Sequence, residues 1–353
     1  MHILNKKKVV IAMSGGVDSS AAAWILKEQG YDVIGMMLKI WDDLSKCCSL
    51  EDIADARDVA MNLGIPFHLK KYQPLFEKEI VNPFVESYLK GETPLPCATC
   101  NSKIKFPLIL EEGKKLGSEY LATGHYAKIK KLNDGTYSLF KGDDPKKDQT
   151  YFLFQLKQHQ LKHILFPVGE MNKAEVREIA ENVGVNMAQK QESQEVCFVQ
   201  DDYKGFIESR VPFNILKKGN IITRKGEILG KHSGIHRYTI GQRKGLGISW
   251  TSPLYVIEID AKNNNIIVGK NDDLYTPNVL AKDLTWLNKK PQLGEIVTAK
   301  VRYSQIAEPA KIIAINDNEI ELKFEKEQRA VTKGQGLVIY RDDTELLGGG
   351  IIL

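Results

Sequence analysis

The sequence predicts an α/β amino-terminal domain, in which helices cover both faces of a parallel sheet, followed by a small β-rich central domain and a carboxyl-terminal β-barrel. Two observations support this fold class. Over about the first two hundred residues, short apolar runs alternate with helical patterns, which is typical of a parallel sheet covered by helices. Beyond about residue 205, short alternating runs with glycine-rich turns replace the helical periodicity. We expect domains at residues 1–204, 205–277 and 278–353.

The elements of the amino-terminal domain follow one another in a regular order. Predicted strands cover residues 9–12, 33–38, 65–69 and 120–123, and predicted helices cover residues 20–29, 49–63, 77–89 and 104–116. Gly30 is placed to cap the first helix, and Ser49 starts the second, with acidic residues in its first turn. The last of these strands ends at Gly124 and His125, where sheets of this kind place ligands.

The remaining elements are short strands. Residues 219–269 contain several of them in the central domain. In the last domain, runs at 296–302, 310–314, 320–324 and 337–340 are spaced as in a small barrel or sandwich.

The positive charge of the chain is concentrated in one segment. The net charge is +4, but residues 204–250 hold ten Lys and Arg against two acidic residues, so this segment carries +8 and the remainder −4. Such a segment points to a polyanionic partner, although a solvated basic surface would have the same composition. We expect His232 and His236, at this segment, to be solvated loop residues rather than phosphate contacts.

The composition, 42% apolar and 27% charged, is that of a soluble globular protein. The apolar stretch near the amino terminus ends at Ser14, too soon for a signal peptide, and no run approaches the roughly 20 apolar residues of a membrane-spanning helix. We therefore expect a cytoplasmic protein with no membrane partner. In that reducing compartment, an odd set of cysteines indicates catalysis, metal binding or plain burial rather than a disulfide framework. The five are Cys47, Cys48, Cys97, Cys100 and Cys197.

The strongest single motif is Ser-Gly-Gly-Val-Asp-Ser-Ser at residues 14–20, between the first predicted strand and helix. A turn there can direct backbone amides, hydroxyls and the positive end of a helix at phosphate. No Gly-Lys-Ser/Thr follows, so it is not the usual nucleotide loop. The motif resembles the PP-loop of the ATP pyrophosphatases, whose domain has the adenine nucleotide alpha hydrolase-like fold. A tight turn that merely needs its glycines is the alternative.

Three thiols stand in positions that suggest chemistry. Cys97 and Cys100 are three residues apart, just before a predicted helix that holds Lys103 and Lys105. A thiol near a helix start and lysines has a depressed pKa, so we expect it to be a good nucleophile at neutral pH. Cys197 follows nearly a hundred residues later.

Together with the loop, these runs closely resemble the bacterial tRNA-specific 2-thiouridylase family, which thiolates the wobble uridine of the anticodon. The similarity extends over nearly the whole chain, through the runs at 93–101, 122–127, 147–152, 193–198, 237–247 and 301–303. The resemblance implies an ATP and Mg²⁺ site at a set of residues from the loop and two strand ends. These are Ala12, Met13, Ser14, Gly15, Gly16, Val17, Asp18, Ser19, Leu38 and Gly124. Family members often have methionine at the position of Leu38, an exchange that an adenine pocket tolerates.

The resemblance also implies the order of the chemistry. The uridine O2 attacks the α-phosphate of ATP, which makes AMP the leaving group. Cys197 carries a persulfide received from a sulfur-donor protein of a relay, and its terminal sulfur reaches C2. Cys100 is the nucleophile that releases the sulfur by forming a disulfide with Cys197, so turnover needs a reductant.

The same resemblance implies contacts with the tRNA anticodon stem-loop, the first three of them beside the target base. The residues are Leu95, Pro96, Cys97, His125, Lys147, Asp148, Gln149, Arg302, Tyr303 and Gln335.

The role of Cys97 has several alternatives. Some family members have an aspartate at this position, and that carboxylate is credited with general acid/base catalysis. Cys97, Cys100 and Cys197 could instead ligate a 4Fe-4S cluster, or zinc with His125 as a fourth ligand. Cys97 could also be an inert small residue. Cys47 and Cys48 are expected to be structural or incidental.

Two rival functions share part of this pattern. One is another PP-loop ligase, such as a 4-thiouridine synthase, which usually carries an added RNA-binding domain ahead of the loop, or an amidating synthetase, which would not need the paired thiols. The other is a metal-binding RNA-interaction protein that has lost catalysis, against which the intact loop argues.

Overall fold

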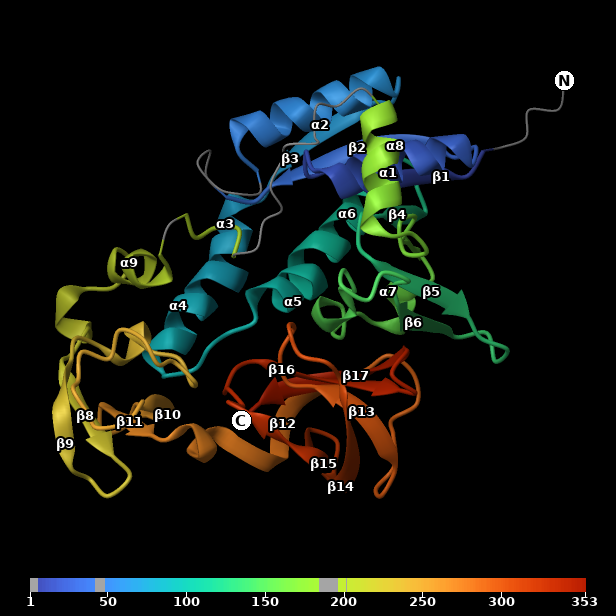
Figure 1. Ribbon diagram of the computed structural model, residues 1–353. Helices are drawn as coiled ribbons and strands as arrows, with labels where there is room; N and C mark the ends of the chain where they lie inside the picture. Colours follow the sequence, from blue (N-terminus) through green and yellow to red (C-terminus); the bar gives the residue numbers. More distant parts are fainter. Residues whose placement is uncertain (1–5, 42–47, 184–195, 201) are drawn as a thin grey trace, which may run out of the picture.

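The computed structural model describes residues 6–41, 48–183, 196–200 and 202–353. Figure 1 shows three units: the amino-terminal α/β unit at the top, the central unit at the lower left and the carboxyl-terminal barrel at the lower right. Within the described ranges, no helix is long and apolar enough to cross a membrane.

The amino-terminal unit is built on a five-stranded parallel sheet. The parallel sheet and four of its strands confirm the prediction, whereas the short β7 was not predicted. Its strands are β1 (Lys8–Ala12), β2 (Asp32–Lys39), β3 (Phe67–Lys71), β4 (Tyr120–Ala122) and β7 (Ile164–Leu165). The order is β3-β2-β1-β4-β7, so the chain leaves β1 toward one edge and later returns to its other side at β4. The strand order therefore reverses between β1 and β4, which is where open α/β sheets bind ligands.

Helices cover both faces of this sheet. Along β1, Val9 and Ile11 enter the core beneath α1 (Val17–Glu28), α2 (Leu50–Asn62) and α8 (Lys173–Asn182). Val10 points to the other face and packs with α6 (Phe106–Lys115). This alternation is what a strand buried on both sides requires. Ser49 and Asp52 form the capping box that starts α2, which confirms that prediction.

Two helical runs of this unit contain a π turn. The first consists of α3 (Gln73–Phe76), η1 (Glu77–Val81) and α4 (Asn82–Leu89). The second consists of α5 (Pro96–Cys100), η2 (Asn101–Lys105) and α6. Both begin before the predicted starts at residues 77 and 104. A proline stands in the first turn of each, at the first position of α5 and the second of α3, where its missing N–H costs no helical hydrogen bond. π turns often mark functional positions, and η2 directly follows Cys100.

The carboxyl-terminal unit is a closed six-stranded barrel. Of the two predicted alternatives, a small barrel or a sandwich, the barrel is therefore confirmed. Its strands are β12 (Tyr275–Trp286), β13 (Ile296–Lys300), β14 (Glu308–Ile315), β15 (Glu319–Arg329), β16 (Gly336–Arg341) and β17 (Glu345–Ile352). Pairing of β12 with β17 closes it. The hairpin of β5 (Ala127–Lys131) and β6 (Tyr137–Lys141), which the sequence analysis missed, pairs through β6 with β17. The amino-terminal unit and the barrel thus share one sheet.

The central unit contains β8 (Gly219–Thr223), β9 (Ile228–His232), β10 (Tyr255–Asp260) and β11 (Asn265–Gly269), in the order β10-β11-β8-β9. The short elements between the sheets are η3 (Thr150–Phe152), α7 (Gln158–Leu161), α9 (Tyr203–Glu208), η5 (Phe213–Ile215), η6 (Ile235–Arg237) and η7 (Asn271–Leu274).

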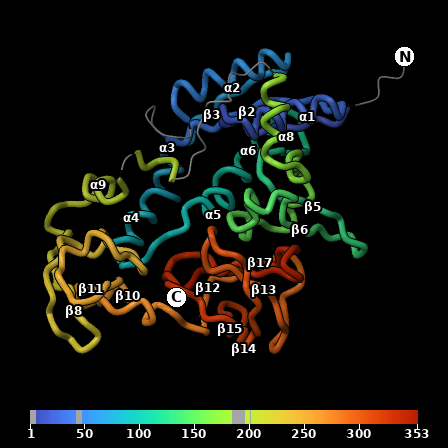
Figure 2. The backbone as a smooth tube through the Cα atoms, in the orientation of Figure 1, coloured from blue at the N-terminus to red at the C-terminus, as the bar shows by residue number. Residues whose placement is uncertain are grey.

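The expectation of solvated histidines is wrong, because His232 and His236 are both buried. His232 contacts the Asn264 carbonyl at 3.1 Å, and His236 lies 2.9 Å from the Glu208 carboxylate. Figure 2 shows the path of the chain, with the carboxyl terminus at the barrel.

Candidate functional site

The loop between β1 and α1 is organised by its own serines. Ser19 Oγ donates to the Gly16 carbonyl at 3.0 Å and accepts from the Ser14 backbone N–H at 3.2 Å. The Ser14 hydroxyl lies 3.2 Å from the Ser19 hydroxyl, and the Ser14 residue is exposed. Gly16 is the N-cap of α1, and no side chain caps that helix end. The positive end of the helix therefore faces an open loop, as an anion site requires.

Two glycines permit close approach around this loop. Gly15 has φ +69°, and a Cβ on it would lie 2.4 Å from the Asp52 carbonyl oxygen of α2. Gly124, which follows β4, lies against the loop, and a Cβ there would stand 2.7 Å from the backbone carbon of Asp18. Neither position accommodates a side chain without backbone movement. Because β4 lies beside β1 in the sheet, Gly124 lies next to the loop between β1 and α1. The resemblance placed Gly124 and that loop in the same ATP site.

Asp18 is held by two residues, Tyr126 and Lys173, that no sequence motif assigns to the loop. Its Oδ1 accepts hydrogen bonds from the Tyr126 hydroxyl at 2.8 Å and from the Lys173 ammonium at 2.6 Å. Lys173 is the first residue of α8, and its ammonium also lies 5.9 Å from the Tyr126 ring centroid. The sequence signal for α8 is its capping residue Asn172. Nothing local reveals that the next side chain reaches Asp18, because that contact depends on how α8 packs on α1.

The other expected ATP-site residues surround the same strand ends. Ala12 ends β1, Met13 is buried, and the Met13 backbone N–H donates to the Met36 carbonyl at 2.8 Å. Val17 is buried at the start of α1. Leu38 is half-buried near the end of β2 and contacts the apolar cores on both faces of the sheet. These residues provide an apolar wall beside a polar loop.

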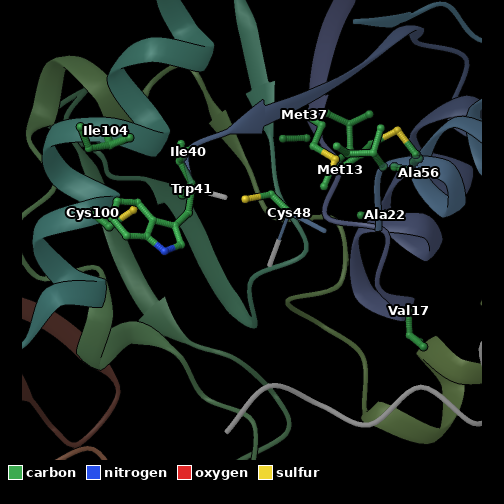
Figure 3. Packing of buried hydrophobic residues seen from close by; sticks show 14 of the residues in the cluster. Met13, Val17, Ala22, Met37, Ile40, Trp41, Cys48, Ala56, Cys100 and Ile104 are labelled. Carbon is green, nitrogen blue, oxygen red and sulfur yellow. The ribbon is translucent and has the colours of Figure 1, made fainter. Parts of the chain in front are cut away.

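The three candidate cysteines interact with one another. Cys197 influences the ionisation of both Cys97 and Cys100, and Cys97 influences that of Cys100, so the three sulfurs lie within electrostatic range. Cys100 is buried at the end of α5, Cys97 is exposed one helical turn earlier, and Cys197 is half-buried. All three are free thiols. Figure 3 shows Cys100 with Trp41 and Ile104 in the buried cluster that also contains Met13 of the loop.

The prediction of a depressed thiol pKa is wrong. Burial raises the pKa of Cys100 to about 12, which outweighs the opposing effect of the Lys105 charge and a backbone hydrogen bond from Lys105. The pKa of Cys97 is raised to about 11, because protein atoms crowd its sulfur although the residue as a whole is exposed. Desolvation of the thiolate therefore outweighs the lysine and the helix start, and both groups are thiols at neutral pH.

An aromatic cluster anchors the segment that carries Cys197. The Phe198 ring is buried against Phe76, Phe84 and Phe206, with ring centroids 5.6, 5.1 and 5.5 Å away. Trp41 joins it at 6.1 Å. Residues 193–195, which precede Cys197 in the motif, lie outside the described residues, as does Cys47. Cys48 is buried, as expected of a structural cysteine.

In the described ranges of the chain, the structure provides no ligand set for a 4Fe-4S cluster or for zinc. There, no group of three His, Cys, Asp or Glu residues is placed to hold a metal ion. The proposed cluster or zinc ligands Cys97, Cys100 and Cys197 all belong to those ranges. The three sulfurs are therefore near one another without forming the converging set that a cluster or zinc requires.

The barrel contacts the chain just before Cys97. Gln335 Nε2 donates to the carbonyls of Thr93 at 3.0 Å and Pro94 at 3.1 Å. Leu95 is half-buried against the core on the face of the sheet that α6 covers, and Pro96 is buried at the first position of α5. The barrel thereby fixes the start of the helix that carries the two thiols.

Other residues expected to contact tRNA differ in accessibility. Tyr303 is 38% exposed, and its ring lies 4.6 Å from that of Phe152. Lys147 and Gln149 are half-buried, and the Gln149 side chain accepts from the Tyr126 backbone N–H at 3.1 Å. Asp148 is buried, and its carboxylate accepts a hydrogen bond from the Thr150 hydroxyl at 2.8 Å.

Arg302 and His125 are engaged with the protein. The Arg302 guanidinium donates to the Ala330 carbonyl at 2.5 Å and the Ile240 carbonyl at 3.2 Å, which ties the barrel to the central unit. His125 Nδ1 is 2.6 Å from the Thr123 hydroxyl. Burial, helped by the Lys105 charge, lowers the pKa of His125 to about 3, so this ring is neutral at physiological pH.

Comparison with protein families gives three matches in chain order. Residues 7–201 match the family model described as "tRNA methyl transferase HUP domain". Residues 204–270 match "tRNA methyl transferase PRC-barrel domain", and residues 276–352 match "Aminomethyltransferase beta-barrel domain".

Curated relatives are similar over nearly the whole length. The tRNA-specific 2-thiouridylase MnmA 1 of Clostridium botulinum (strain Loch Maree / Type A3) is 45% identical, over 98% of this chain and 99% of that protein. The tRNA-specific 2-thiouridylase MnmA of Geotalea uraniireducens (strain Rf4) is 47% identical, over 98% of this chain and 95% of that protein. Among solved structures, a 4-thiouridine synthetase–RNA complex with bound ATP aligns with a TM-score of 0.36 and 15% identity, covering 58% of this chain and 50% of that one.

Proposed function

This chain belongs to the tRNA-specific 2-thiouridylase family, and from that premise we propose that it is an ATP-dependent sulfurtransferase acting on the wobble uridine of tRNA. The products are 2-thiouridine, AMP and pyrophosphate. The observation that carries the proposal is the combination, in one molecule, of an anion-type loop and three mutually interacting thiols. An amidating ligase would need the loop but not the thiols.

In the first step, the uridine O2 attacks the α-phosphate and the bond to pyrophosphate breaks. The loop amides and the start of α1 are suited to hold the departing pyrophosphate, since backbone N–H groups at a helix start bind anions. Asp18 is the carboxylate of the loop that could ligate Mg²⁺, which would supply charge neutralisation for the polyphosphate. Lys173 and Tyr126 orient that carboxylate.

In the second step, the terminal sulfur of a Cys197 persulfide attacks the activated C2 and AMP departs. The uridine is then joined to Cys197 through a disulfide. The Cys100 thiolate attacks the Cys197 sulfur, which forms a Cys100–Cys197 disulfide and releases the electron pair of the broken bond to the 2-thio group. A dithiol reductant restores both thiols. The sulfur-donor protein of a relay supplies the persulfide.

The raised pKa of Cys100 gives this order a physical reason. A buried thiol is a weak nucleophile, and Cys100 is protonated at neutral pH, so its attack on the persulfide is slow. Premature attack on the persulfide, before sulfur reaches the uridine, is thereby slowed. Cys97 is exposed near the target base in this proposal, and we assign it no covalent step.

The test combines product analysis with single cysteine replacements. We expect tRNA and ATP to give AMP and pyrophosphate with wild type, and Cys197→Ser or Cys100→Ser to abolish thiolation while adenylation persists. Cys97→Ser should retain thiolation, and protein purified without oxygen should be colourless. ADP and phosphate as products would contradict the adenylation step, and visible absorption that Cys97→Ser removes would restore the cluster alternative.

A further inference from the structure

The central unit contains a pocket that is separate from the loop and the thiols. Its volume is about 420 Å³, and the segment between η6 and β10 lines it with Arg243, residues 245–248 and residues 250–254. Leu246 and Leu254 are buried in the core of the unit and form an apolar base. At the rim stands Trp250, which is 45% exposed, beside the polar Thr251 and Ser252.

The base of this segment is held rigidly. The Gly241 backbone N–H donates to the Val256 carbonyl at 2.8 Å, and the Val256 N–H donates to the Gln242 carbonyl at 2.9 Å. The Gln242 side chain accepts from the Thr239 N–H at 3.2 Å and donates to the Lys244 carbonyl at 2.9 Å. The pocket is therefore preorganised, which lowers the cost of ordering it around a ligand.

The pocket also carries unpaired positive charge. Three arginines of the basic segment are occupied by carboxylates, in the pairs Arg210–Glu77, Arg224–Asp273 and Arg237–Glu208. Arg243 lines the pocket and Lys244 follows it in the chain. Both are exposed, and neither side chain has a carboxylate partner among the residues with described coordinates. The free charge of a segment with a net charge of +8 thus includes Arg243, which lines the same pocket as the exposed indole of Trp250, and its chain neighbour Lys244.

We propose that this pocket binds a nucleobase of the tRNA together with a flanking phosphate, at a site separate from the wobble uridine. An unpaired base stacks on Trp250, and Arg243 and Lys244 hold the backbone phosphate. Aromatic platforms beside cations are how proteins bind single-stranded nucleotides. A nucleic acid is favoured over a protein partner because the segment that forms the pocket carries a net charge of +8, which suits a polyanion. The inference rests on the proposed function, since that function makes tRNA the macromolecular substrate.

The stacking role is tested with tRNA transcript and the full-length protein in the absence of ATP. Trp250→Ala should weaken tRNA binding roughly tenfold, as removal of a stacking aromatic does, whereas Trp250→Phe should keep most of the affinity. Phe213→Ala is the matched control, because Phe213 is 87% exposed in the same unit but does not line the pocket. That variant should bind like wild type. Trp250 fluorescence, isolated by comparison with Trp250→Phe, should be quenched by tRNA.

The phosphate contact is tested through the salt dependence of binding. Arg243→Gln should reduce the slope of log affinity against log salt by about one. Arg224→Gln is its matched control, because Arg224 is exposed in the same segment but paired with Asp273. An unchanged slope for Arg243→Gln would overturn the phosphate assignment.

The outcomes separate this site from the proposed function. If wild type thiolates tRNA while Trp250→Ala binds tRNA like wild type and no quenching occurs, the pocket is not an RNA site and the function stands. If tRNA binding depends on Trp250 but wild type produces no thiouridine with a persulfide donor, the pocket stands and the function fails. Quenching by another protein but not by tRNA would also overturn the inference.

Discussion

Replacing Lys173 by methionine removes one charge from the loop while keeping an unbranched side chain of similar length. In the structure, its ammonium donates to Asp18 Oδ1 at 2.6 Å, and the two side chains are 13% and 31% exposed. Hydrogen bonds that involve a charged group contribute about 1.5–3 kcal/mol. If Lys173 orients Asp18 for the polyphosphate and its metal ion, this amount is lost from ATP binding. The KM for ATP should then rise roughly 10- to 150-fold, since about 1.4 kcal/mol corresponds to a factor of ten.

The assay is pyrophosphate release at saturating tRNA with ATP varied, alongside thermal unfolding of the same preparations. Lys173→Arg is the matched control, because it keeps the positive charge, and it should recover most of the ATP affinity. Tyr126→Phe removes the other hydrogen bond to the Asp18 carboxylate, which also involves a charged group, and should cost about 1.5–3 kcal/mol. A Lys173→Met variant with lowered thermal stability but an unchanged KM for ATP would refute the assignment, because the ion pair would then be purely structural.

Three further predictions concern the thiols and the loop. The rate of Cys100 alkylation, measured by site-resolved mass spectrometry, should rise about tenfold per pH unit from pH 7 to 10. The reason is that a thiol with a pKa of about 12 gains thiolate throughout that range. A rate that levels off near pH 8 would contradict the argument that burial raises this pKa. Phe198→Ala should lower the free energy of unfolding by about 3–5 kcal/mol in denaturant titrations, because it leaves a cavity in a buried aromatic cluster. A loss below about 1 kcal/mol would show that Phe198 does not anchor the segment that carries Cys197. Gly124→Ala should abolish pyrophosphate release, because its Cβ would stand 2.7 Å from the Asp18 backbone, and wild-type turnover would show that the loop tolerates displacement.

The parts of the fold that could be predicted from sequence are those set by local patterns. The buried strands β1, β2 and β4 appear as apolar runs because both of their faces are covered. Ser49 marked the start of α2 through its own hydrogen bonds. The loop at 14–20 could be found because its glycines and serines act on their own backbone.

The remaining features depend on tertiary contacts. The β5–β6 hairpin is stabilised by pairing with β17, two hundred residues away, which no local pattern reveals. Lys173 reaches Asp18 only because α8 packs on α1. The thiol pKa was predicted in the wrong direction because desolvation of Cys100 is set by the surrounding fold. His232 was expected to be exposed, but it is buried by tertiary packing that no local sequence pattern indicates.

The central claim is that ATP activates the uridine oxygen and that sulfur then displaces it. The most direct measurement uses tRNA whose wobble uridine carries a heavy-oxygen label at O2, incubated with ATP, a persulfide donor and the full-length protein. Mass spectrometry of the products should find the label in AMP, in equal amount to the 2-thiouridine formed. Thiouridine formed with unlabelled AMP, or with the label in phosphate, would contradict the account.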